Sequence, residues 1–376
     1  MPKSSGANRP WPPPKRRYTP KLAPELRLGK LEKTSVDGFV AWPDELAARY
    51  RSLGLWEGVT VGGLLTRSAQ RWPHKLALVQ GAQRLSYADL LARCQDLAAR
   101  LSALGLRPGE RVLLQLPNTV DFVLSYFALN LIGAIPVMAL RAHRHAEVRH
   151  FLRASGAVAY IVPDVLGSFD FRTMAAQMQA EFAGLRHVLV SGEAAAGQQA
   201  LADLPAGNHA PAGPRPSDVS TMLLSGGTTS LSKLIPRTHD DYVLNARLCG
   251  TAAGFDANTV LLAILPLGHN YNLASPGMLG CFYYGGTVVL ATGTSVEEIF
   301  TTIARERVTV AAAVVPLITA WVNSDAITAH DLSSLKVVQN GGARLAPELR
   351  KRLRDQFQCT PQEIYGTAEG LINMTR

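Results

Sequence analysis

Short apolar runs alternate with helix-like stretches along most of this 376-residue chain. Strand-like runs at 111–115, 157–161 and 187–190 are separated by amphipathic segments, and the same rhythm returns after residue 219. Strands that alternate with helices form βαβ units, in which the strands run parallel and helices cover the sheet. The sequence therefore predicts an α/β fold, with two α/β subdomains whose largely parallel sheets are flanked by helices.

Composition divides the chain into four predicted parts. Residues 1–40 form a basic, Pro-rich and flexible arm, because closely spaced prolines prevent a long helix. A first α/β subdomain is expected over 41–191 and a linker rich in Ala, Gly and Pro over 192–218. The second α/β subdomain, over 219–376, carries the motifs that point to a binding site.

The net charge of +9 comes mostly from the arm, whose residues 1–33 hold nine basic and two acidic side chains. A basic arm raises nucleic acid and anionic membranes as partners. Because the rest of the chain is close to neutral, we expect neither nucleic acid nor membrane as a partner. The four cysteines form no CxxC pair and none stands at metal-ligand spacing from a histidine. This pattern favours a reduced, cytoplasmic protein without a zinc site.

An uncharged stretch from Phe122 to Leu140 is long enough to span a bilayer. It contains Gly133 and Pro136, which are typical of a helix end followed by a different element. We therefore expect a buried helix over about 120–131 and then a buried strand.

A loop rich in glycine and hydroxyl groups, LSGGTTSLSK at 224–233, follows a strand-like run. Backbone N–H groups and hydroxyls in such a loop can bind phosphate oxygens, and a lysine supplies positive charge. The Walker pattern does not fit, because Leu234 follows Lys233. On these residues alone, an anion-binding loop and a solvated surface loop are both possible.

The loop and the residues after it, LIPRTH, resemble the phosphate-binding loop of the adenylate-forming superfamily, in the form found in its aryl-acid-activating branch. Ser230 and Ser232 depart from the family pattern, which has Gly and Pro there. The resemblance covers about residues 40–376. Four further segments resemble superfamily motifs in the same order: LSYADL at 85–90, NLIGAIPV at 130–137, QNGGARL at 339–345 and IYGTAEG at 364–370.

The resemblance implies ATP and Mg²⁺ as cofactors. It places Lys233, Thr228, Thr229 and His269 in catalysis, and Glu369 at the metal, which prefers carboxylate and phosphate oxygens. Without the resemblance, Glu369 would equally suit a solvated loop. The implied ATP-binding residues are Ser225, Gly226, Gly227, Thr228, Thr229, Ser230, Lys233, Gly341, Gly342, Ala343, Ile364, Tyr365, Gly366 and Thr367.

A second cluster, HNYNLASPG at 269–277, places an imidazole, an amide, a phenol and a hydroxyl just before a helix. Such groups suit a small polar aromatic ligand, although a lone loop histidine is often satisfied locally. The segment resembles HNYPLSSPG of 2,3-dihydroxybenzoate-activating enzymes, in which Asn270 would contact the ring 2-hydroxyl and Ser275 the 3-hydroxyl. The implied substrate-binding residues are His269, Asn270, Tyr271, Ser275, Gly342 and Ile372.

The reaction that the resemblance implies joins an aryl acid to ATP and gives aryl-AMP and pyrophosphate. The aryl acyl group is then transferred to the phosphopantetheine of an aryl carrier protein, as part of siderophore or nonribosomal peptide synthesis. Ser275 favours 2,3-dihydroxybenzoate. Salicylate and other hydroxy-aryl or heteroaryl acids remain alternatives, because Asn272 and Ala274 replace the family's Pro and Ser.

Family members continue into a small C-terminal domain, so we expect this chain to act as a large N-terminal domain with weak adenylation activity. A fragment that binds aryl acid and nucleotide without catalysis is the alternative from another class. An acyl-CoA or fatty-acid ligase is disfavoured, because a lipid tail requires an apolar tunnel rather than the polar groups at 269–275.

Overall fold

The computed structural model describes residues 36, 38–208, 213–226 and 231–375. Within these residues the strands form two large sheets and a hairpin of β6 (Val165–Leu166) and β7 (Phe169–Asp170). The order of the eight-stranded sheet is β17 (Ile372–Met374), β16 (Thr360–Gly366), β15 (Val337–Gly341), β14 (Val310–Ala313), β12 (Val260–Ala263), β13 (Thr287–Leu290), β1 (Leu76–Gln80) and β2 (Gln83–Ser86). The order of the seven-stranded sheet is β11 (Leu234–Thr238), β10 (Val219–Leu224), β4 (Ile135–Met138), β3 (Arg111–Leu114), β5 (Ala159–Pro163), β8 (His187–Ser191) and β9 (Gln199–Ala200).

Both large sheets are parallel except at their edges. In the eight-stranded sheet, β12 pairs in parallel with β13, with Leu261 opposite Val288. The edge strands β2, β17 and β11 are antiparallel to their neighbours, since each follows its partner through a short connection. The prediction of an α/β fold with largely parallel sheets is confirmed.

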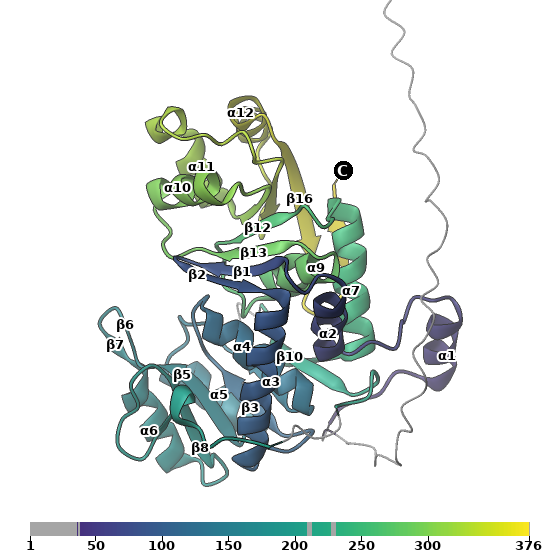
Figure 1. The fold of residues 1–376 in the computed structure, drawn as a ribbon, viewed down its shortest axis with the longest axis vertical. Helices are drawn as coiled ribbons and strands as arrows, with labels where there is room; N and C mark the ends of the chain where they lie inside the picture. The colour runs from purple at the N-terminus through teal and green to yellow at the C-terminus, as the bar shows by residue number, and fades with distance from the viewer. Residues whose placement is uncertain (1–35, 37, 209–212, 227–230, 376) are drawn as a thin grey trace, which may run out of the picture. The chain divides into compact units, whose positions relative to one another are not determined.

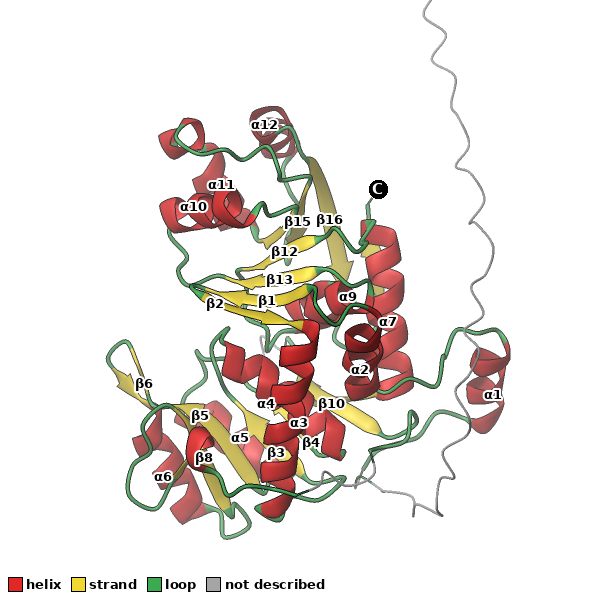
Figure 2. Cartoon of the chain, viewed as in Figure 1, coloured by secondary structure: helices red, strands yellow, loops and turns green. Residues whose placement is uncertain are grey.

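The helices form three layers around the two sheets (Figures 1 and 2). Between the sheets lie α2 (Val61–Arg71), α3 (Tyr87–Ala103), α4 (Val120–Ile132), α7 (His239–Ala253) and α9 (Gly277–Tyr283). The outer face of the seven-stranded sheet is covered by α5 (His145–Ser155) and α6 (Phe171–Glu181). The outer face of the eight-stranded sheet is covered by α10 (Val296–Glu306), α11 (Val315–Val322) and α12 (Pro347–Phe357). The remaining helices are α1 (Asp44–Ser52), α8 (Asn270–Ala274) and the 3₁₀ turns η1 (Leu201–Asp203) and η2 (Asp325–Thr328).

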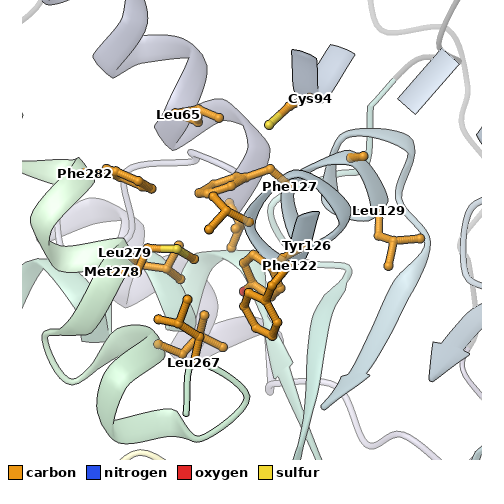
Figure 3. Close-up of a cluster of buried hydrophobic side chains, with 14 of the residues drawn as sticks. Leu65, Cys94, Phe122, Tyr126, Phe127, Leu129, Leu267, Met278, Leu279 and Phe282 are labelled. Carbon is orange, nitrogen blue, oxygen red and sulfur yellow. The ribbon is translucent and has the colours of Figure 1, made fainter. Parts of the chain in front are cut away.

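Alternating side chains explain why both faces of each sheet are covered. In β3, Val112 and Leu114 pack into the central layer, whereas Leu113 packs beneath the outer helices. In the central layer, the rings of Phe127 of α4 and Phe282 of α9 have centroids 5.9 Å apart (Figure 3). The largest core therefore lies between the sheets and holds them together.

The uncharged stretch after Phe122 folds as expected. Thr119 caps α4, and Gly133 ends the helix in the left-handed conformation with φ of 76°. The strand β4 follows at once and is buried throughout. No helix in the described part of the chain is long and apolar enough to cross a membrane.

The sheets do not follow the division that the sequence predicts at 192–218. Strand β1 belongs to the first part of the chain but joins the eight-stranded sheet, with Leu78 opposite Val288. Conversely, β10 from the second part joins the seven-stranded sheet, with Met222 opposite Val137. Each part of the chain thus contributes a strand to the sheet of the other part, and the described residues from Val36 onward belong to one compact unit. The arm predicted at 1–40 lies almost entirely outside the described residues.

A buried histidine joins α7 to α2 in the central layer. His239 is fully buried, and its Nδ1 accepts a hydrogen bond of 3.0 Å from the backbone N–H of Val61. An imidazole that accepts at Nδ1 is neutral, and burial lowers the pKa of His239 to about 3.

We therefore expect His239 to reduce the free energy of unfolding by about 2 kcal/mol as the pH falls from about 8 to about 5. Below the ordinary pKa of 6.5, the histidine binds a proton in the unfolded chain but stays neutral in the folded chain. The contribution of the neutral His239 to the free energy of unfolding is therefore complete well above pH 6.5 and is lost progressively toward pH 3. Urea denaturation at both pH values measures the loss. His239→Asn keeps a hydrogen-bond acceptor but does not titrate, so the free energy of unfolding of this variant should fall less between the two pH values. An equal fall in both proteins would contradict the assignment of His239 as a buried neutral histidine.

Candidate active site

A cavity of about 910 Å³ lies where the carboxyl ends of strands from both sheets meet. Met138 ends β4 and Gly341 ends β15, and both line the cavity. Ligands of parallel α/β proteins bind beyond the carboxyl ends of the strands, because loops with polar groups emerge there. The exchange of strands between the two halves of the chain therefore creates one shared site.

The cavity brings together most of the site residues that the sequence predicts, although their roles stay predictions. Among described residues, Lys233, Ala343 and Tyr365 do not line the cavity, and Tyr365 is 71% exposed. The predicted positions 227–230, which are Gly227, Thr228, Thr229 and Ser230, lie outside the described residues. The predicted residues that line the cavity are Ser225, Gly226, His269, Asn270, Tyr271, Ser275, Gly341, Gly342, Ile364, Gly366, Thr367, Glu369 and Ile372.

The two ends of the predicted phosphate loop are held together by the pairing of β10 with β11. The backbone N–H of Ser225 donates to the carbonyl of Lys233 at 3.0 Å, and the N–H of Lys233 donates to Ser225 Oγ at 2.9 Å. From α5, His150 Nε2 donates to the carbonyl of Ser232 at 2.8 Å. Ser225, Gly226 and Ser232 line the cavity, so both ends of the loop reach it.

The short helix α8 carries the predicted aryl-acid residues. His269 caps it, because its Nδ1 accepts from the backbone N–H of Tyr271 at 3.2 Å. Desolvation lowers the pKa of His269, so its imidazole is neutral at pH 7. His269 thus combines a local capping role with a position on the cavity wall.

Polar groups at the buried end of the cavity are held by α7. Asn270 is 7% exposed, and its side-chain oxygen accepts from the hydroxyl of Tyr242 at 3.0 Å. Asn245 Nδ2 donates to the carbonyl of Ala274 at 2.7 Å and to Ser275 Oγ at 3.4 Å. Because Ser275 Oγ already accepts a hydrogen bond, its O–H remains available as a donor.

The turn between β16 and β17 forms the exposed rim of the cavity. Thr367 N–H donates to the carbonyl of Leu371 at 2.9 Å, and Gly370 adopts φ of 121°, which favours glycine. Beneath this turn, the buried Arg237 donates to the carbonyl of Ala368 at 2.9 Å and pairs with Asp241 at 2.6 Å. Glu369 is thus carried on a turn that a buried cation anchors.

Sequence reasoning missed several residues that support or line this cavity. Arg237 occurs in the motif LIPRTH, where its spacing of four residues from Asp241 is the signal that could have revealed the pair. His143 lines the cavity and its Nδ1 accepts from the backbone N–H of Leu140 at 3.0 Å. Tyr242 and Asn245 gave no local signal, because their partners lie 28 to 30 positions away.

The residues that line the cavity could bind Mg²⁺ only together with a nucleotide, whose phosphate oxygens would supply further ligands. Glu369 supplies one exposed carboxylate to the cavity. Across the described ranges, no group of three or more His, Cys, Asp or Glu side chains could hold a metal ion. Since Mg²⁺ often takes one or two carboxylates together with substrate phosphates, a single carboxylate suffices for this binding mode.

Comparison with known proteins agrees with this geometry. Residues 65–376 match the family model described as AMP-binding enzyme. The chain is 44% identical over 339 residues to a 2,3-dihydroxybenzoate-AMP ligase of Bacillus subtilis (strain 168), covering 90% of this chain and 63% of the relative. It is 43% identical over 348 residues to a salicyl-AMP ligase / salicyl-S-ArCP synthetase of Mycobacterium tuberculosis, covering 90% of this chain and 61% of the relative.

Among solved structures, the apo structure of MbtA from Mycobacterium smegmatis superimposes with a TM-score of 0.84 and 38% sequence identity. That match covers 90% of this chain and 62% of the MbtA chain. The chain therefore spans less than two thirds of the length of each of these relatives.

Proposed function

This chain belongs to the AMP-binding enzyme family, and we propose that it activates an aryl acid with an ortho hydroxyl, preferably 2,3-dihydroxybenzoate, by forming the aryl-adenylate from ATP. The observation that carries the proposal is the shared cavity. One space of about 910 Å³ is lined by the ends of the phosphate loop, by Glu369 and by the polar groups of Asn270 and Ser275. Such a cavity can hold an aryl acid and a nucleotide side by side.

In the proposed reaction a carboxylate oxygen of the acid attacks the α-phosphorus of ATP, and the bond to pyrophosphate breaks. Both reactants are anions, so positioning and charge neutralisation supply most of the rate enhancement. Ser225, Gly226 and Lys233 belong to the loop that binds the phosphates, with Thr228 and Thr229 in the same role. When bound with ATP at Glu369, Mg²⁺ supplies further positive charge near the phosphate oxygens.

We place the aromatic ring at the buried end of the cavity. Asn270 and Ser275 both line this part of the cavity. In this placement Asn270 would contact the ring 2-hydroxyl, and Ser275, whose Oγ accepts from Asn245, would offer its O–H to a 3-hydroxyl. A hydroxyl partner for the 3-position favours 2,3-dihydroxybenzoate, because salicylate would leave the Ser275 donor unpaired. Salicylate is the second candidate, since the salicyl-AMP ligase is as similar to this chain as the 2,3-dihydroxybenzoate-AMP ligase.

The partner proposed for the product is an aryl carrier protein. An aryl-adenylate is a mixed anhydride, which a phosphopantetheine thiol attacks at the carbonyl carbon with release of AMP. The printed name of the Mycobacterium tuberculosis relative, salicyl-S-ArCP synthetase, supports this class of acceptor. Siderophore or nonribosomal peptide synthesis is the process that uses such thioesters.

Calorimetry on the purified chain tests the proposal. We expect ATP with Mg²⁺ to bind, and 2,3-dihydroxybenzoate to bind about tenfold more tightly than salicylate. Ser275→Ala should remove this preference, because the 3-hydroxyl of 2,3-dihydroxybenzoate loses its partner and salicylate no longer leaves a Ser275 donor unpaired. Failure of every hydroxybenzoate to bind would overturn the proposed function, whereas equal binding of the two acids would make salicylate an equal substrate.

A further inference from the structure

We propose that Tyr242 is a positioning residue that fixes the orientation of the Asn270 amide. In this orientation the amide presents an N–H donor to the cavity. The donor selects aryl acids with an ortho oxygen over aryl acids with an ortho amino group. This inference rests on the proposed function, because it concerns the acid subsite of the same cavity. It adds a residue that does not line the cavity and a substrate class that the site rejects.

Two partners determine which way the Asn270 amide faces. Tyr242 Oη donates to Asn270 Oδ1 at 3.0 Å, and Asn270 Nδ2 donates to the backbone carbonyl of Thr367 at 3.4 Å. A carbonyl oxygen can only accept, so a reversed amide would place two acceptors against each other at Thr367. The hydrogen bond to Tyr242 stabilises the same orientation from the opposite side.

The amide nitrogen carries two hydrogens, and Thr367 takes only one of them. Asn270 lines the cavity and is 7% exposed, so its remaining N–H is the group that a ligand meets. The acid subsite therefore presents a donor, not an acceptor, at this position.

The surroundings of Tyr242 keep its hydroxyl protonated, so that it can donate. The side chain is fully buried in α7, and the guanidinium of Arg237 lies 5.0 Å from the centre of its ring. Burial raises the pKa of Tyr242 well above its ordinary value, so the hydroxyl keeps its proton at working pH. A neutral phenol in a packed site donates to Asn270 Oδ1 without competition from water.

The chemistry of ortho-substituted benzoates explains the expected selectivity. In an ortho-hydroxybenzoate, the hydroxyl donates to the neighbouring carboxylate and leaves its oxygen lone pairs free to accept from Asn270. In an ortho-aminobenzoate, one N–H bonds the carboxylate and the other points toward Asn270, so that donor faces donor. A benzoate without an ortho group leaves the Asn270 donor unpaired.

Calorimetry on the unmodified chain with salicylate, benzoate and anthranilate tests the donor assignment. We expect salicylate to bind at least about tenfold more tightly than benzoate, and anthranilate no more tightly than benzoate. Anthranilate that binds as tightly as salicylate would overturn the inference while leaving aryl-acid activation in place. If none of the three acids binds, the proposed function fails and the inference fails with it.

Tyr242→Phe tests the positioning role. This variant removes the donor to Asn270 Oδ1 and leaves the amide held only by the 3.4 Å contact of its nitrogen with the carbonyl of Thr367. The orientation is then less strongly fixed, so the preference for salicylate over benzoate should fall about tenfold and anthranilate should gain affinity. The affinity for ATP, measured in parallel, reports on the fold of the variant.

The matched control is Tyr87→Phe. Tyr87 is also fully buried, and its hydroxyl donates to the carbonyl of Gly286 at 2.6 Å, away from the cavity. This control should lose stability but keep the preference for salicylate over benzoate. If Tyr242→Phe also keeps that preference, Tyr242 has only a structural role and the inference is overturned. If Tyr242→Phe does not fold, the unmodified chain still provides a test, because anthranilate that binds it as tightly as salicylate overturns the inference.

Discussion

Replacing Gly341 with valine is expected to weaken aryl-acid binding by about 100-fold, which corresponds to about 2.7 kcal/mol. A Cβ atom at Gly341 would lie 2.7 Å from Cε1 of Tyr271, closer than two carbon atoms can approach. The tyrosine ring must therefore move, and the cavity that it lines is the open space available to it. Once displaced, the ring occupies the volume that we assign to the aryl acid. Calorimetry with 2,3-dihydroxybenzoate measures the loss.

Stability should change little in Gly341→Val, because the ring moves into open space and a β-branched residue suits the end of a strand. The matched control is Gly250→Val in α7. A Cβ at Gly250 would lie 2.5 Å from Cε2 of Tyr284, a ring that does not line the cavity. This control should lose stability through overpacking and keep its affinity for the acid. Equal acid affinity in Gly341→Val and the unmodified chain would show that the acid binds elsewhere.

The fold could be predicted from the sequence where its causes are local. The end of α4 depends on Gly133, whose left-handed φ of 76° suits glycine, and on the strand residues that follow directly. The cap of α3 likewise depends on Ser86, which is three positions before Asp89. Such signals lie within a few residues of each other, so the order of helices and strands could be read from the chain.

The exchange of strands between the sheets could not be predicted in the same way. Leu78 lies opposite Val288, more than two hundred positions later in the chain, and Met222 lies opposite Val137. A strand that is buried on both faces has the same apolar sequence whichever neighbour it pairs with. The composition of the segment 192–218 marks a change in the chain but contains no information about these pairings.

The candidate site shows the same contrast. Its motifs were found because each is contiguous, and the structure brings their cavity-lining members together around one space. The sequence motifs did not reveal the residues that contact the cavity-lining segments without lining the cavity themselves. Arg237 binds the carbonyl of Ala368 across 131 positions, and Tyr242 binds Asn270 from a different helix. Such contacts become visible only when the fold brings the end of β11 and the start of α7 close to the turn that carries Glu369 and to α8.

Replacing Arg237 with methionine is expected to lower the free energy of unfolding by about 3 kcal/mol. The guanidinium is buried, pairs with Asp241 at 2.6 Å and donates to the carbonyl of Ala368 at 2.9 Å. Methionine fills much of the volume but leaves a poorly exposed carboxylate without its cation, and removing one partner of such a pair is strongly destabilising. Urea denaturation at pH 7 measures the change.

A second substitution identifies the origin of this loss. Arg237→Met combined with Asp241→Asn should recover part of the stability, because asparagine carries no charge and its oxygen can still accept from the N–H of Thr238, as Asp241 does at 3.0 Å. The exposed pair of Arg307 with Asp331, at 2.7 Å, is the matched control, and Arg307→Met should change stability far less because solvent screens both charges. If the double variant is no more stable than Arg237→Met alone, the loss arises from packing and from the Ala368 contact rather than from the unpaired carboxylate.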